Sequence, residues 1–361
     1  MIPRFTTPFL VLVLLMSLSF VGKAQDDCVV KLNEAEKLYE EGKIEKIPEM
    51  LNSCIESGFN KENKITALRL LTLVYLFDDN LIKAESSLLR LLKEDPEFKT
   101  NQAIDPVEFT RLYNSFNTSP IFSLGVVLGV NSSMPRLIEP YGTAPYEDSD
   151  PTYSANGFGY NAGIRSAFHL NHQWDIIFEP TLTTYSFSVK ENVANPIINS
   201  TLNDETMTYI DFPVFSSYIF YKYNSISVYG ELGAIYGMYL SGNYNGTSTF
   251  KSNENPDYEG SSLSMTDLRK EYLIMGSLGV GSKFKIYRGN VALNIRYKFG
   301  FNNVMNTDIR YSPKFDQIMS DFMDIGNDFS NSNISISVSY NYEFYIHHKK
   351  PTNKSNYDVV K

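Results

Sequence analysis

The chain has 361 residues, a formal net charge of −9 and 14% aromatic residues, with 25 Tyr and 24 Phe but a single Trp. The acidic balance argues against a nucleic-acid-binding protein, because such proteins neutralise phosphates with a basic face. The length allows two domains. The many tyrosines suit a membrane–water boundary, because each ring is apolar and carries a polar hydroxyl.

The N-terminus has the pattern of a cleaved signal peptide over residues 1–24. Arg4 supplies positive charge, an apolar run follows from Phe9 to Val21, and the segment from Gly22 to Ala24 fits a cleavage site before Gln25. The alternative, a membrane anchor helix, needs about 20 apolar residues, whereas this run has roughly 13. No later stretch is apolar for long enough to form a membrane helix, so any further span must be built from strands.

The two cysteines are Cys28 and Cys54. An exported chain meets an oxidising compartment, so we expect a disulfide between them. Cys28 could instead be a lipoprotein cysteine, but it follows Asp27, where a lipidation signal has a small residue. Two cysteines and scattered histidines give no metal-site spacing, so no metal site is predicted.

Residues 25–118 are expected to form a small, all-α, helical-repeat-like domain. Apolar residues recur at helical spacing, and Gly42 and Gly58 lie where helices would end. A further helix is predicted to start at Asp105-Pro106 and to be broken after Phe116.

The last helical unit before Pro96 resembles a tetratricopeptide repeat. The matching positions are Leu68, Leu71, Tyr75, Ala84, Leu88 and Pro96, and a degenerate earlier copy is indicated by Ala35, Leu38 and Gly42. In this alignment Cys28 begins one helix and Cys54 ends the next, so antiparallel packing would bring them together. Such a domain is either a concave surface that binds a protein or peptide, or a compact cap without a ligand.

From Ile121 onward the apolar period changes from 3.6 to 2. Apolar residues alternate with small, polar or charged ones, most clearly from Val291 to Phe301 and from Ile334 to Phe344. The pattern predicts strands near 121–131, 156–170, 174–190, 205–220, 225–243, 270–287, 290–304 and 332–346.

The connections between these strands predict the fold. Tight turns at 171–173, 222–224 and 288–289 alternate with longer polar segments near 132–155, 191–204, 244–269 and 305–331. A soluble antiparallel sandwich would also show alternating strands. Short turns that alternate with long loops are typical of a bacterial outer-membrane barrel, with the short turns in the periplasm.

We therefore predict an all-β transmembrane antiparallel barrel of about eight strands over residues 119–346. An even number of strands places both the helical domain and the C-terminus in the periplasm. The tail over residues 347–361 is basic and polar and is expected to be disordered.

Charged residues fall on the inward side of the predicted strands. Because charges facing lipid would be costly, they are expected to form a charge network in the lumen. Its members are Arg165, Glu179, Asp211, Glu231, Lys283, Lys285, Arg296, Lys298 and Glu343. An eight-stranded barrel is just wide enough to be filled by side chains, so we expect a plugged interior. A narrow pore or a ligand site in the lumen is the alternative.

No catalytic constellation is apparent. A barrel enzyme needs a nucleophile and a base, or an equivalent, near one rim. The four histidines lie at an expected turn or in the tail: His169, His172, His347 and His348. The sequence contains neither a G-x-S-x-G motif nor a Gly-rich phosphate loop after a strand. We predict that the protein is not an enzyme and that it has no catalytic residue and no cofactor.

Four segments are similar to the PorT-like outer-membrane β-barrel family. They are Phe122 to Asn131, Tyr209 to Pro213 with its Tyr-aliphatic-acid-aliphatic-Pro pattern, Tyr229 to Gly233, and Leu278 to Gly281. The resemblance covers about residues 121–346 and implies an outer-membrane location. Some members of that family assist protein secretion, and many have no assigned role.

Our leading hypothesis is a non-enzymatic outer-membrane protein that anchors or docks a partner through its periplasmic helices. The alternatives are a small pore or a transport or secretion accessory, a lipid-modifying barrel enzyme, and a soluble periplasmic β-sandwich. The expected partners are outer-membrane lipid and a periplasmic protein.

Overall fold

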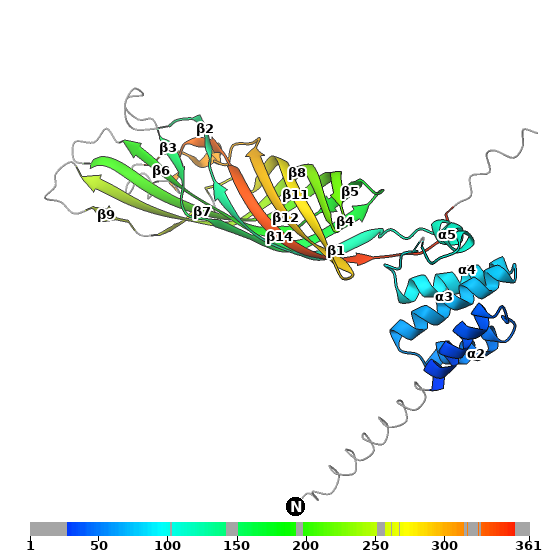
Figure 1. Ribbon diagram of the computed structural model, residues 1–361. Helices are drawn as coiled ribbons and strands as arrows, with labels where there is room; N and C mark the ends of the chain where they lie inside the picture. Colours follow the sequence, from blue (N-terminus) through cyan, green and yellow to red (C-terminus); the bar gives the residue numbers. More distant parts are fainter. Residues whose placement is uncertain are drawn as a thin grey trace, which may run out of the picture. The chain divides into compact units, whose positions relative to one another are not determined.

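The computed structural model describes residues 27–101, 103–141, 151–192, 198–250, 257–260, 262–266, 268–313, 316, 324 and 326–350. The predicted signal peptide lies outside these residues. The chain divides into two units (Figure 1). One contains the helices before Pro120 together with the segment that starts at Tyr345, and the other contains residues 120–344.

The helical unit consists of two helical hairpins and one shorter helix. Its helices are 27–40, α2 (Ile47–Ser57), α3 (Lys61–Phe77), α4 (Leu81–Glu94) and α5 (Val107–Asn114). Asn60 and Asn80 cap α3 and α4, because each side chain accepts a hydrogen bond from a backbone N–H in the first turn. Gly42, with a φ of 73°, lets the chain turn sharply after the first helix. No described helix combines the length and apolarity that crossing a membrane requires.

The helices pack around an apolar core that includes Leu51, Leu68, Leu88 and Phe109. A disulfide joins Cys28, in the first helix, to Cys54, in α2, with the two Cα atoms 5.6 Å apart. Both cysteines are buried. The disulfide therefore joins the two open ends of the first helical hairpin.

The segment after the barrel returns to the helical unit. Residues 116 and 349 form an antiparallel bridge, and the backbone N–H of Asn117 donates to His348 O over 2.9 Å. Lys349 Nζ forms an ion pair with Glu85 at 2.5 Å. The tail was predicted to be disordered from residue 347, but residues 347–350 have defined partners here. The sequence did not show this, because the pairing joins segments more than 200 residues apart.

The second unit is an antiparallel barrel. The strands of its ring are β1 (Phe122–Ser133), β4 (Gly159–His169), β5 (Trp174–Phe178) followed by β6 (Thr181–Asn192), β7 (Ile198–Tyr223), β8 (Ile226–Phe250), β11 (Tyr272–Ile286), β12 (Gly289–Gly300) and β14 (Ser332–Phe344). Several short elements lie at the end of the barrel opposite the tight turns. They are β2 (Arg136–Glu139), β3 (Thr152–Ala155), β9 (Tyr258–Glu259), β10 (Leu263–Ser264), the 3₁₀ turn η1 (Thr307–Ile309) and β13 (Asp328–Ser330).

The ring closes because each strand pairs with its neighbour in the chain and β14 pairs with β1. With β5 and β6 taken as one interrupted strand, the ring has eight strands, which confirms the predicted fold. The interruption is at Pro180, which has no N–H to donate to the ladder. Gly163 lies opposite this break, where a Cβ would come within 2.1 Å of Pro180 O, so the close approach requires glycine.

Two hairpins extend further than the sequence predicted. Most of 191–204 was expected to be a loop, but β6 and β7 pair as far as Asn192 and Ser200. Likewise, β8 continues to Phe250 beside β7. The prediction was wrong there because the outward residues become polar, for example the paired residues Asp204 and Asn245, so the amphipathic signal is lost although pairing continues.

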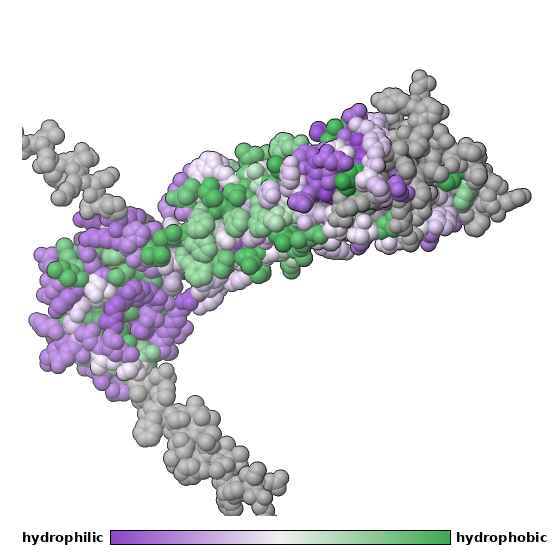
Figure 2. Space-filling model, turned by 180° about the vertical axis from the view of Figure 1, so that it is seen from behind, coloured by the Kyte–Doolittle hydropathy of each residue, from purple (hydrophilic) through white to green (hydrophobic). Residues whose placement is uncertain are grey.

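The outer surface of the barrel carries a belt of exposed apolar side chains. On β14 it runs from Ile334 to Phe344 at every second residue, and Figure 2 shows it as the green middle part of the barrel. At about 3.3 Å per residue and a tilt of about 40°, this length corresponds to roughly 25 Å along the barrel axis, the height of a transmembrane apolar band.

Candidate functional site in the barrel interior

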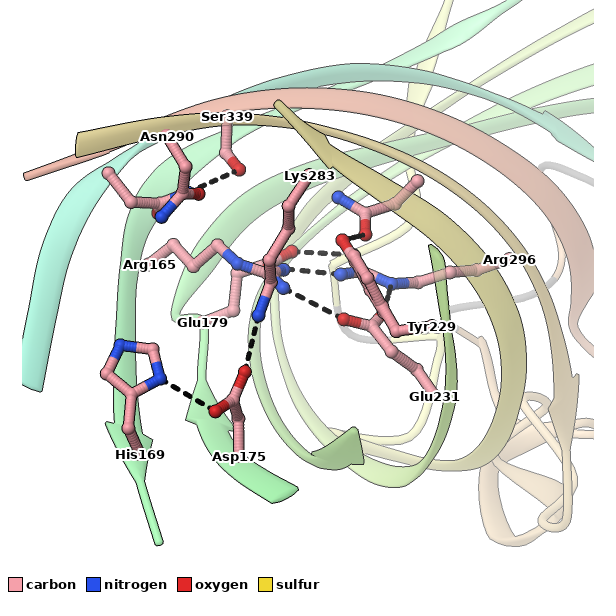
Figure 3. A network of polar contacts seen from close by, with 12 residues as sticks. Arg165, His169, Asp175, Glu179, Tyr229, Glu231, Lys283, Asn290, Arg296 and Ser339 are labelled. Atoms are coloured by element: carbon pink, nitrogen blue, oxygen red, sulfur yellow. Dashed lines mark hydrogen bonds and ion pairs between the residues drawn. The ribbon is translucent and has the colours of Figure 1, made fainter. Parts of the chain in front are cut away.

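Four charged side chains form a closed ring inside the barrel (Figure 3). Arg165 comes from β4, Glu179 from the break between β5 and β6, Glu231 from β8 and Arg296 from β12. Arg165 donates to both glutamates, with its Nη2 2.8 Å from Glu231 Oε1. Arg296 also contacts both, at 2.7 Å to Glu179 Oε1 and 2.8 Å to Glu231 Oε2.

This quartet is buried and has no net charge. Its side chains are at most 3% exposed, and its two positive and two negative charges cancel. The Arg296 guanidinium also lies over the ring of Phe215, 4.4 Å from the centroid. Paired guanidinium–carboxylate contacts in such a site are directional and hold the strands in one register. The quartet therefore crosslinks four strands across the lumen.

A second group lies nearer the tight-turn end. Asp175 accepts from His169 Nδ1 at 2.7 Å and also forms an ion pair with Lys283 (Figure 3). The sequence analysis did not place Asp175 or His169 in the lumen network. The alternation of inward and outward residues along the strand indicates the position of Asp175. It precedes Ile177 by two residues and Glu179 by four, so it shares their inward face.

The rim at this end holds another predicted pair. Lys285 Nζ is 2.5 Å from Glu343 Oε2, and Asn290 Nδ2 donates to Glu343 Oε1 over 2.9 Å. Lys285 is partly exposed, so this contact belongs to the mouth of the barrel and not to its dry interior.

His169, Asp175 and Ser217 are the residue types of a catalytic triad, but their order in the sheet is wrong for one. Asp175 is the cross-strand partner of both His169 and Ser217, so it lies on the strand between them. His169 and Ser217 are thus two strands apart, about 10 Å at the backbone. A serine nucleophile and its base need to be about 3 Å apart.

Asp211 and Lys298 are also buried in the lumen, but no ion pair of 4 Å or less joins Lys298 to any described residue. Asp211 instead accepts a hydrogen bond of 2.6 Å from the Tyr185 hydroxyl. The sequence predicted that all inward charges would pair directly. That expectation does not hold for Lys298, and the contact of Asp211 is with a tyrosine from β6.

An apolar layer closes the lumen beyond the quartet. Its buried members come from five strands and one connecting segment: Tyr185, Phe187, Val189, Met207, Tyr209, Ile235, Leu273, Met275, Val304 and Phe329. Edge-to-face contacts such as Phe187–Phe329, with ring centroids 5.3 Å apart, hold the layer together. The described interior is therefore filled by a charged layer followed by an apolar layer.

More charged contacts lie past the apolar layer, and all of their residues except Glu205 were assigned to loops from the sequence. Arg269 makes a two-pronged contact with Glu205, at 2.7 and 2.6 Å, and Arg310 pairs with Asp328. Glu191 accepts from Asn327. Glu191 lies beyond the apolar belt, and burial together with the nearby charge of Asp324 raises its pKa to about 8.

No group of three or more His, Cys, Asp or Glu side chains within the described part of the chain is arranged to hold a metal ion. A groove with a volume of about 320 Å³ lies outside the barrel, against Tyr297 and Phe299.

A closed eight-stranded antiparallel barrel with an apolar outer belt and a charged, packed interior defines the class of outer-membrane β-barrel proteins. A family model described as "outer membrane protein beta-barrel domain" matches residues 116–306, more than half of the chain. The chain belongs to this family.

Comparison with individual proteins adds no finer identity. No curated protein matches the chain. Among solved structures, the chain is similar to Ail, the attachment invasion locus protein of Yersinia pestis, with 12% identity and a TM-score of 0.27 over 62% of this chain and 100% of that one. It is also similar to Neisserial surface protein A, with 10% identity and a TM-score of 0.28 over 60% and 95%. The outer membrane protease OmpT from Escherichia coli shares 8% identity, with a TM-score of 0.26 over 63% and 98%. Likenesses at this level carry no inference about activity.

Proposed function

We propose that this protein is a non-enzymatic outer-membrane anchor whose helical unit binds a protein partner in the periplasm. The observation that carries the proposal is an exposed apolar surface on the helical unit. We call it the helical patch. Its members are Phe77, Leu81, Ile82, Ile104 and Val107.

Phe77 of the helical patch lines a groove, and Val107 lies between two further lining residues, Pro106 and Glu108. A cavity of about 280 Å³ is lined by Tyr39, Leu73, Leu76, Phe77, Pro106 and Glu108. Phe77 and Ile82 are 71% and 83% exposed, although the unit has a well-filled core nearby. Large exposed apolar side chains beside a groove are typical of a protein interaction site.

The charges around the groove indicate what kind of segment would bind. Glu108 lines it, and Asp78 and Asp79 are exposed in the turn that follows Phe77. The partner segment is therefore expected to present apolar side chains with lysine or arginine beside them.

The filled lumen supports an anchoring role over conduction. A pore would need a continuous polar path, whereas the quartet and the apolar layer occupy successive levels of the interior. A planar bilayer that contains the protein should therefore show no stepwise conductance. A stable ion current would favour the pore or transport accessory.

In this proposal, the end of the barrel that carries the tight turns faces the periplasm. Short turns face the periplasm in outer-membrane barrels, and both chain connections to the helical unit leave the barrel at the end that carries these turns, after Ser119 and Phe344. The proposal also includes a cleaved signal peptide over residues 1–24.

Site-specific photocrosslinking in intact cells tests the docking role. A photoreactive residue at Ile82 or Val107 should give a crosslinked product of defined mass, whereas one at Val30 should not. Val30 is a matched control because it is also an exposed apolar residue, but it lies nine residues before Tyr39 on the same helix, about 13 Å away. Equal crosslinking at all three positions, or none at any, would contradict a specific docking surface.

A further inference from the structure

The groove on the outside of the barrel lies at one edge of the apolar belt. It is lined by Met134, Arg136, Tyr297, Phe299, Gly300, Phe301 and Ser332 and has a volume of about 320 Å³. Its floor consists of small residues, Gly300 and Ser332. One wall consists of the aromatic side chains at the end of β12 and directly after it, which are Tyr297, Phe299 and Phe301. Met134 and Arg136 form the other wall.

The groove opens on the lipid-facing side of the sheet. Ser332 pairs with Phe299 and has the same outward register as Ile334 and Ile336, which belong to the apolar belt. Tyr297, Phe299 and Phe301 continue the belt along β12, with Phe299 and Phe301 in edge-to-face contact at 5.1 Å. An acyl chain that lies along the belt can therefore extend into the groove and remain in contact with apolar side chains.

Arg136 provides a charge at the polar end of the same groove. It is exposed, and among the described residues no carboxylate lies within ion-pair distance of it. On β14 the first belt residue is Ile334 and the preceding outward residue is Ser332, so the groove straddles the boundary between apolar belt and polar surface. An arginine at this boundary stays solvated or pairs with a headgroup, because a bare charge inside the apolar layer is costly.

The geometry points to a binding site for one phosphate-bearing membrane lipid, in the leaflet at the end of the barrel away from the tight turns. Its acyl chain lies along Tyr297 and Phe299 above the floor at Ser332, and its phosphate is held by Arg136. The planar guanidinium matches two phosphate oxygens at once, which an ammonium group does not. This inference uses the barrel alone and does not depend on the docking role of the helical unit.

Native mass spectrometry of the full-length protein in detergent tests the site, with phosphatidic acid as the probe and phosphatidylcholine as the comparison lipid. Wild-type protein should retain one phosphatidic acid molecule in preference to phosphatidylcholine. Arg136→Gln should weaken that binding about tenfold, as expected for loss of a charge-assisted contact. Arg136→Lys should restore only part of it.

Two further variants separate the groove from general charge. Lys190→Gln removes an exposed cation of β6 that does not line this groove, and should leave lipid binding unchanged. Ser332→Leu keeps Arg136 but fills the floor, and should weaken binding of the lipid. Equal loss from Arg136→Gln and Lys190→Gln, no preference for phosphatidic acid in the wild type, or full displacement by inorganic phosphate would each overturn the proposal. Heat-modifiable migration on gels verifies that each variant is folded.

Discussion

Removal of Glu231 from the quartet tests how dry the barrel interior is. Glu231 accepts hydrogen bonds from Arg165 Nη2 and Arg296 Nε, each at 2.8 Å, and its side chain is fully buried. In Glu231→Ala, the two guanidiniums share Glu179 alone, so the quartet changes from neutral to a net charge of +1.

The cost follows from that uncompensated charge. Breaking a buried pair by removing one partner typically costs about 3–5 kcal/mol. With an unfolding slope of about 2–3 kcal/mol per molar urea, the midpoint should fall by about 1–2 M. The single tryptophan, Trp174, which lies 4.8 Å from Tyr218, provides a fluorescence signal for unfolding from lipid vesicles.

Two companion variants sharpen the measurement. Glu259→Ala removes an exposed glutamate from the end of the barrel away from the tight turns and should leave the midpoint unchanged. Glu231→Leu combined with Arg296→Leu removes one charge of each sign and leaves Arg165 paired with Glu179. The double variant should therefore lose less stability than the sum of its single changes. If Glu231→Ala and Glu259→Ala have the same urea unfolding midpoint, the interior is hydrated. That result would favour the pore hypothesis.

Three further predictions concern other parts of the chain. Replacement of Cys28 and Cys54 by serine should destabilise the helical unit by about 3 kcal/mol, as expected for a crosslink across 26 residues, and should speed its proteolysis in the full-length protein; unchanged proteolysis would count against it. Glu191 has a folded-state pKa of about 8, above its unfolded value, so stability should rise as the pH falls from about 8 toward 4.5. Glu191→Gln should remove that rise in thermal gel-shift assays, and a persisting rise would assign it to another group. A cysteine at Asp257, in a background without native cysteines, should react with a membrane-impermeant maleimide on intact cells, and one at Lys61 should not; the reverse pattern would invert the proposed topology.

Local pattern was enough to predict the barrel. The alternation of apolar and polar residues has a period of two wherever a strand faces lipid on one side and the lumen on the other, as along β14 from Ile334 to Phe344. The tight turns at 224 and 288 are equally local, because each contains a residue with positive φ, Asn224 or Arg288. The helix end at Gly42, whose φ is 73°, was readable for the same reason.

Strand length and lumen pairing could be decided only by the tertiary structure. Beyond the belt, the outward residues of β7 and β8 face water, so a paired strand has the composition of a loop. The partners in the quartet are separated in the chain by 14 positions, for Arg165 and Glu179, and by 117 positions, for Glu179 and Arg296. The sequence therefore determined which charges face inward. Which carboxylate meets which guanidinium, and that a tyrosine takes the place of Lys298 beside Asp211, depends on strand register and barrel closure.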